Sequence, residues 1–260
     1  MVVTFTLAVT SEHVYPVMPF MSYTGDRPVE SCIFSFGLNS IAATYIIICY
    51  LRYAVRCNPV DYDDSDRYQQ IIKICEEDSP SHPNSILRMN RKSLWWGISS
   101  AAGLSVTGSF QELHVASVHR LGALICTYCG FIYFWYQTVL SDLMIGKLNS
   151  RKMSYLRTSL SLASTMIHVV APILVTILDT VYPRHHEETL LWSIDEAGWH
   201  LHVCCSFLEW TIFFINVTYL ASFYKEFKLI KINKDEITFT RQEELTQRPG
   251  TENGVHRKSK

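Results

Sequence analysis

Charged side chains are missing from five long stretches of this sequence, and their absence is its most informative feature. The stretches are Cys32–Leu51, Ser93–Phe110, Leu121–Leu140, Thr158–Leu178 and Leu201–Tyr224, the last interrupted only by Glu209. Each stretch is close to the roughly 20 apolar residues that an α-helix needs to cross a bilayer. Soluble domains rarely contain even one such stretch, so a soluble fold is excluded.

Regular alternation of polar and apolar residues is also missing from these stretches. Strands of a transmembrane barrel would alternate in that way. Because backbone groups in lipid must be hydrogen-bonded within the protein, helices are the remaining solution. The sequence therefore predicts an all-α, polytopic transmembrane helix bundle over residues 1–232, followed by a disordered cytosolic tail over residues 233–260.

A further apolar segment, Met1–Val9, is too short to span a bilayer. At about 1.5 Å per residue it covers less than half of the hydrocarbon thickness. It also lacks the basic segment that opens a signal peptide. We interpret it as the C-terminal end of a first span whose beginning is missing from this chain, so the prediction is five full spans plus this truncated one.

Basic residues are scarce on one side of the predicted bundle. All 23 Lys and Arg residues except Arg27, Arg120 and Arg184 lie in residues 52–92, in residues 142–157 or in the tail from Lys225. Short loops rich in Lys and Arg stay in the cytosol. These three segments are therefore predicted to be cytosolic, and the opposite end of the bundle to be luminal or extracellular.

Several patterns of catalytic and cofactor-binding sites are absent, including the P-loop, the dinucleotide glycine fingerprint, Gly-x-Ser-x-Gly and His-Glu-x-x-His. We therefore expect no catalytic residues, no cofactor, no bound metal and no nucleic acid partner. Membrane lipids are the expected partners. In the cytosolic loop, Tyr68–Gln69–Gln70–Ile71 fits the Tyr-x-x-Φ pattern that clathrin adaptors bind, so Tyr68 and Ile71 form a hypothetical sorting motif.

Five ionisable residues map to the luminal end of the predicted bundle: Glu30, Glu112, His119, His202 and Glu209. Glu209 lies about 10 Å deep in its helix, where a lone carboxylate is costly and is normally paired or functional. His202 shares its helix face, two turns earlier, and His119 is a second candidate partner. Two interpretations stay open: a lipid-headgroup or proton-responsive site, and an internal polar clamp that holds the helices together.

Four motifs around these residues resemble those of the damage-regulated autophagy modulator (DRAM) family, part of the Frag1–DRAM–Sfk superfamily. They are Pro19-Phe-Met-Ser-Tyr-Thr-Gly-x-x-Pro-x-Glu-Ser31, Phe110-Gln-Glu112, Val118-His119-x-x-Gly-Ala123 and His202 through Glu209-Trp210. The resemblance implies six spans with both termini in the cytosol. It also implies residence in the lysosomal or endosomal membrane, and promotion of autophagy without catalytic activity.

The superfamily also leaves two alternatives open. Some relatives act in remodelling the lipid of glycosylphosphatidylinositol anchors, and such chemistry here would use His119, His202 and Glu209. Others organise a phosphoinositide kinase at the plasma membrane, which would make this chain a scaffold. The corresponding alternative locations are the plasma membrane and the Golgi or endoplasmic reticulum membrane.

Overall fold

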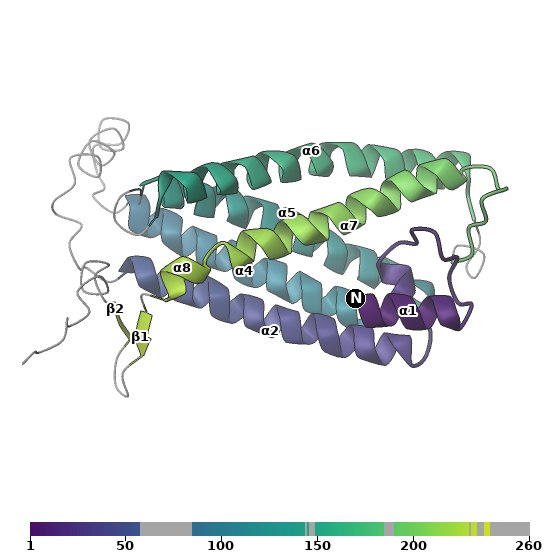
Figure 1. The fold of residues 1–260 in the computed structure, drawn as a ribbon, viewed down its shortest axis with the longest axis horizontal. Helices are drawn as coiled ribbons and strands as arrows, with labels where there is room; N and C mark the ends of the chain where they lie inside the picture. The colour runs from purple at the N-terminus through teal and green to yellow at the C-terminus, as the bar shows by residue number, and fades with distance from the viewer. Residues whose placement is uncertain are drawn as a thin grey trace, which may run out of the picture.

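Five long helices lie side by side along the longest dimension of the molecule (Figure 1). The computed structural model describes residues 1–57, 85–143, 145, 149–184, 190–228, 230–232 and 237–239. In chain order the elements are α1 (Val2–Thr10), η1 (Ser22–Gly25), α2 (Glu30–Cys57), α4 (Ser85–Ser109), α5 (Glu112–Leu143), α6 (Arg151–Val181), α7 (Trp199–Ala221), α8 (Tyr224–Phe227), β1 (Ile230–Ile232) and β2 (Ile237–Phe239).

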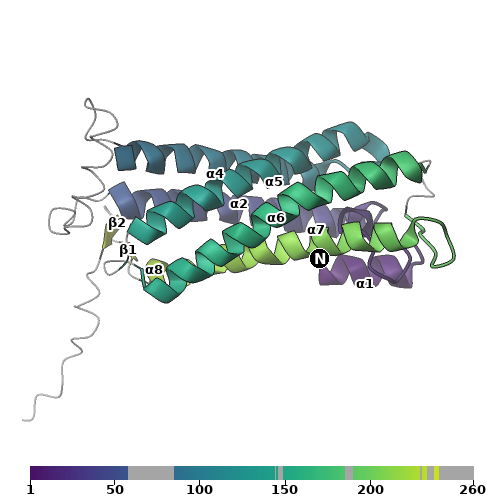
Figure 2. The same cartoon turned by 90° about the horizontal axis from the view of Figure 1, so that it is seen from above.

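The two ends of the bundle differ. One end, here called the loop end, carries α1 and the connecting segments 11–29 and 190–198 (Figure 1). The other, here called the tail end, carries α8 and the two strands. Seen from above, α6 lies over the bundle and crosses it from the tail end to the loop end (Figure 2). The loop end is the one that the charge pattern predicts to be luminal.

The predicted spans coincide closely with the long helices, which confirms the membrane helix bundle. Four stretches are long and apolar enough to cross a membrane: Glu30–Ala54, Glu112–Leu143, Arg151–Val181 and Trp199–Phe227. The predicted span Ser93–Phe110 lies almost wholly in α4, which is not among these four. The small and hydroxyl-bearing residues of α4 lower its hydropathy, so the count of five spans stays a prediction.

Helices α4 and α5 form a hairpin whose backbones approach closely at two glycines. A Cβ at Gly103 would lie 2.4 Å from the backbone nitrogen of Cys126, and one at Gly122 would lie 2.9 Å from that of Thr107. Beside them, the Ser100 hydroxyl donates to the Cys126 carbonyl over 2.7 Å. Small residues at four-residue spacing permit such an approach. The hairpin is therefore a tight frame that runs the length of the bundle.

Apolar side chains fill the centre of the bundle and also cover its outside. The largest buried cluster consists of Tyr45, Cys49, Ala101, Tyr133, Phe134, Tyr219 and Phe223. On the outer surface, Phe36 is 77% exposed and Met166 is 65% exposed, with many other large apolar side chains around them. So much exposed apolar surface is unfavourable in water, and it fits a surface that faces lipid.

A cluster of charged side chains is sealed inside the tail end. Arg52 and Arg157 are fully buried, and both pair with Glu226; the Arg157 Nη1 to Glu226 Oε1 distance is 2.7 Å. Both guanidinium groups also lie over the Phe223 ring, 4.1 and 4.5 Å from its centroid. They donate further hydrogen bonds to Gln137, Ser141 and Ser222. The cluster joins α2, α5 and α6 to the end of α7 and to α8.

Beyond α8 the chain forms two short antiparallel strands, with Ile230 opposite Phe239 and Ile232 opposite Ile237. The sequence predicts a disordered tail from residue 233, so the pairing of 237–239 differs from that expectation. β-branched and aromatic residues favour strands, and these segments are rich in them. The rest of the tail, and the sorting motif of Tyr68 and Ile71, lie outside the described residues, so that motif stays a prediction.

Candidate functional site

The segment 11–29 folds over the loop end and is fastened there by α7. The indole N–H of Trp210 donates to the Pro19 carbonyl over 3.0 Å, and the backbone N–H of Met21 donates to Glu209 Oε2 over 2.7 Å. The turn of η1 follows directly, with the Thr24 hydroxyl donating to the Met21 carbonyl over 2.8 Å. This segment therefore forms one wall of the site.

The hydrogen-bond donor to Glu209 is thus a backbone amide, whereas the sequence suggests His202 or His119. Within the described residues, neither histidine forms an ion pair with Glu209. A hydrogen bond to a carboxylate is stronger than one between neutral groups, so an amide can hold this side chain without an opposite charge. Glu209 works here as the anchor of the folded-back segment.

His202 packs as an aromatic ring. Its imidazole stacks on Trp192, with centroids 4.8 Å apart and planes 16° from parallel. The Phe20 ring is perpendicular to the imidazole, with centroids 5.0 Å apart. The side chain is buried, and neither ring nitrogen has a hydrogen-bond partner in the described part of the chain. His202 therefore supports the wall from behind and does not line the cavity described below.

Glu112 and His119 do lie together, at the start of α5. Arg120 Nε donates to Glu112 Oε1 over 3.1 Å, and the Ser22 hydroxyl donates to Glu112 Oε2 over 3.2 Å. His119 Nε2 lies 3.6 Å from Glu112 Oε2, which is too long for a hydrogen bond. His119 Nδ1 lies 2.7 Å from the Phe110 carbonyl, which can only accept, so Nδ1 carries the proton.

Glu30 is separated from the other four predicted residues. It is buried at the start of α2, and its Oε1 lies 2.8 Å from His13 Nδ1. This pair fastens the connecting segment to α2, and Glu30 does not line the cavity. The five residues therefore divide: Glu112, His119 and Glu209 line one cavity, His202 packs behind its wall, and Glu30 belongs to a different contact.

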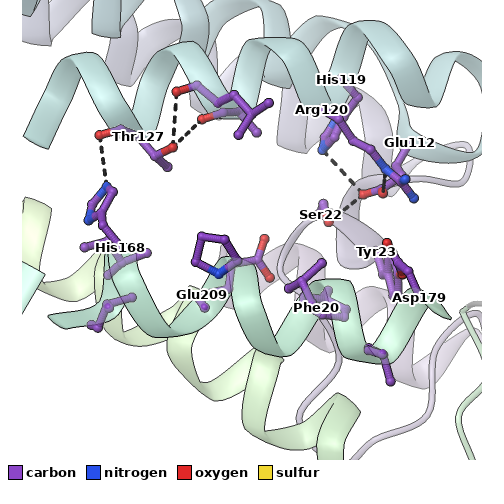
Figure 3. Close-up of a pocket in the computed structure, with 18 of the residues that line it drawn as sticks. Phe20, Ser22, Tyr23, Glu112, His119, Arg120, Thr127, His168, Asp179 and Glu209 are labelled. Atoms are coloured by element: carbon purple, nitrogen blue, oxygen red, sulfur yellow. Dashed lines mark hydrogen bonds and ion pairs between the residues drawn. The ribbon is translucent and has the colours of Figure 1, made fainter. Parts of the chain in front are cut away.

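The cavity has a volume of about 610 Å³ and lies between α5, α6, α7 and the segment 11–29. Figure 3 shows Glu112, His119, Arg120 and Thr127 along one side, with His168 and Asp179 on the opposite side. Glu209, Phe20, Ser22 and Tyr23 complete the lining from α7 and the folded-back segment. Most of its remaining lining is apolar, so the site is an apolar chamber with a polar end.

Two ionisable groups outside the spans are shifted by this environment. Burial raises the pKa of the Tyr23 hydroxyl, and the nearby carboxylates of Glu112 and Glu209 raise it further. Tyr23 is therefore a protonated donor at the cavity wall at all relevant pH. Burial also raises the pKa of Asp26, although the backbone N–H of Leu113, which donates to both of its oxygens over 3.2 Å, acts in the opposite direction.

Several residues that shape this cavity are not among the five predicted site residues: Phe20, Tyr23, Arg120, His168, Asp179 and Trp192. His168 joins α6 to α5, because its Nε2 lies 3.1 Å from the Thr127 carbonyl while Nδ1 lies 2.7 Å from that of Ser164. Phe20 and Tyr23 lie within the first family-like motif, so that motif could have identified them as candidate site residues. Among the described residues, no group of three or more His, Cys, Asp or Glu side chains is placed to hold a metal ion.

The apolar helices and the folded-back segment define a polytopic α-helical membrane protein. The model of the Frag1/DRAM/Sfk1/Cwh43P N-terminal domain matches residues 1–230, and this chain belongs to that family. The match confirms the family inferred from the motifs. It covers every membrane helix and every residue that lines the cavity.

Individual relatives agree with this assignment. DNA damage-regulated autophagy modulator protein 2 of Rattus norvegicus is 27% identical over 232 residues, covering 88% of this chain and 78% of the relative. DNA damage-regulated autophagy modulator protein 1 of Mus musculus is 28% identical over 236 residues, covering 89% of this chain and 86% of the relative. The modulator of macroautophagy TMEM150B of Bos taurus is 34% identical over 140 residues, covering 53% of this chain and 49% of the relative. No solved structure matches this chain.

Proposed function

We propose that this protein is a membrane modulator of autophagy that acts at the lysosome without catalytic activity of its own. The observation that carries the proposal is the family match over nearly the whole bundle, together with relatives that are named as autophagy modulators and not as enzymes. Glu112 and Glu209 both hold the folded-back segment in place, so they are the residues through which a part of the cavity in this role can be tested.

The test uses cells in which the gene is disrupted. Autophagic flux, measured as the turnover of an autophagosome marker with and without a block of lysosomal degradation, is expected to fall and to recover when the wild-type chain is expressed. The tagged protein is expected to coincide with a lysosomal membrane marker. Unchanged flux after disruption, or residence only at the plasma membrane, would refute the proposal.

A site variant links this function to the cavity. Glu209→Gln keeps an oxygen that accepts from the Met21 N–H but removes the negative charge, so we expect normal abundance and location with loss of flux recovery. The matched control is Asp195→Asn, an exposed carboxylate in the segment 190–198 that does not line the cavity. Full recovery by Glu209→Gln would show that its charge plays no part in the function.

Delivery to the lysosome is proposed to depend on Tyr68 and Ile71. Tyr68→Ala is expected to move the protein toward the cell surface, measured by surface biotinylation. Tyr62→Ala is the matched control, because the third residue after Tyr62 is Ser65 and not a bulky apolar one. Equal surface levels for the two variants would show that the motif is not used.

A further inference from the structure

The cavity at the loop end has two chemically different parts. Apolar side chains from three helices line its larger part: Ala123, Leu124, Ile167, Ala171, Val175 and Ile212. Its other part carries Ser22, Glu112, Arg120, Asp179 and Glu209. Binding sites for small molecules typically have volumes of about 300–1,000 Å³, with mostly apolar walls and a few polar groups that orient the ligand. At about 610 Å³ this cavity falls within that range.

Both arginines at the cavity are already engaged by the protein. Arg120 Nε donates to Glu112 Oε1 over 3.1 Å. Arg184 pairs with Glu196, and its guanidinium group lies over the Trp192 ring, 3.9 Å from the centroid. A negatively charged ligand would have to compete with these intramolecular partners for both cations. Carboxylates of the protein therefore already balance the charge of both cations.

Two carboxyl groups at the cavity, in contrast, form no ion pair within the described residues, although the charge of Arg120 acts on Asp179 at longer range. Asp179 lies near the end of α6, exposed at the polar part of the cavity, and forms no ion pair there. Glu209 lies on α7 and is held by the backbone N–H of Met21. Since no ion pair closes off either carboxyl group, a ligand that brings a positive charge complements the polar part of the cavity.

We propose that this cavity binds a single-chain lipid whose headgroup carries an ammonium group. The ammonium lies between Asp179 and Glu209, and the alkyl chain occupies the apolar part between α5 and α6. The rings of Phe20 and Tyr23 line the polar end, where aromatic faces attract a cation. The volume suits one alkyl chain with a small headgroup. This ligand goes beyond the proposed role in autophagy and does not depend on it.

The test compares three ligands with the same eighteen-carbon chain, which differ only in the charge of the headgroup. They are oleylamine, oleyl alcohol and oleic acid, added to the full chain in phosphatidylcholine nanodiscs, with bound ligand measured by native mass spectrometry. Oleylamine is expected to bind at least about tenfold more tightly than the other two, because one charge-assisted contact changes affinity by about that factor. Butylamine, which has the ammonium without the chain, is expected to bind much more weakly.

Three variants locate the site. Asp179→Asn and Glu209→Gln are each expected to lower the affinity for oleylamine about tenfold and to leave that for oleyl alcohol unchanged. Ala171→Phe places a ring in the apolar part and is expected to reduce oleylamine binding while both carboxylates remain. Asp195→Asn, outside the cavity, is the matched control for overall charge and is expected to bind like the wild type.

Two outcomes would overturn the proposal. Equal affinity for oleylamine and oleyl alcohol would show that the carboxylates do not select the headgroup. Equal oleylamine binding by the wild type, Asp179→Asn and Ala171→Phe would show partition into the nanodisc lipid and not into the cavity. Asp179 is exposed and forms no ion pair in the described chain, so Asp179→Asn is expected to fold even if Glu209→Gln does not.

Discussion

Both ends of the bundle hold charged side chains within an apolar structure, but the groups that contact these charges differ between the two ends. At the tail end, Arg52 and Arg157 are fully buried and close on Glu226, which is itself buried. At the loop end, Asp179 and Glu209 face a cavity, and Glu209 is held by a backbone amide. Charges paired with charges fasten helices, whereas charges held by neutral groups beside a cavity remain available to a ligand.

The largest effect is expected at the tail end. Glu226→Gln leaves two buried guanidinium groups without their shared carboxylate, and breaking a buried ion pair typically costs about 3–5 kcal/mol. We expect a large fall in the thermal unfolding temperature in detergent and low abundance in cells. The control is Lys225→Gln, the exposed preceding residue, which should behave like the wild type. A stable Glu226→Gln protein would show that the tail-end cluster does not fasten the bundle.

The second prediction tests whether the α4–α5 hairpin is the rigid frame that both ends share. Gly103→Ala places a methyl group 2.4 Å from the backbone nitrogen of Cys126, so the helices must separate. Overpacking of this kind costs about 1–3 kcal/mol. Gly37→Ala on α2 is the matched control, because a Cβ there meets nothing within 4 Å and alanine favours the helix. Equal unfolding temperatures for the two variants would contradict the tight hairpin.

A smaller effect is expected where a carboxylate is held by the backbone. Glu209→Ala removes the acceptor of the Met21 N–H at a cost of about 1 kcal/mol, since water in the adjoining cavity can replace part of the hydrogen bond. Hydrogen exchange at Met21 and the following residues should become faster. Glu209→Gln keeps an acceptor and should retain slow exchange; fast exchange in both variants would mean that the charge itself holds the segment.

The smallest effect concerns pH and Asp26. Burial raises the pKa of this carboxyl in the folded protein, so its contribution to stability is greatest below its ordinary pKa and is lost as pH rises through the folded value. Asp26→Asn keeps an oxygen for the Leu113 N–H but does not titrate. The gain in unfolding temperature as the pH falls from 7 to the ordinary pKa of an aspartate should therefore be smaller in Asp26→Asn. An equal gain would assign the pH response to other groups.

The helices themselves could be predicted from the sequence because membrane spanning depends on a local property. An uncharged stretch of about 20 residues must be helical wherever it packs, so the long helices and their order followed from charge alone. The close approach of α4 and α5 also depends on a local property, because Ser99, Gly103 and Thr107 place small residues at four-residue spacing on α4. The family followed from four motifs, each of which is a short continuous stretch of the chain, and the family model matches residues 1–230.

Which helices face one another was decided only by the tertiary structure. Met21 and Glu209 are 188 positions apart, and the Arg52–Arg157–Glu226 cluster draws on three separate elements. Helical spacing placed His202 and Glu209 on one face, but it could not show that Trp192 would cover the imidazole while a backbone amide took the carboxylate. Periodicity determines the face of a helix, whereas packing of the whole bundle determines what that face meets.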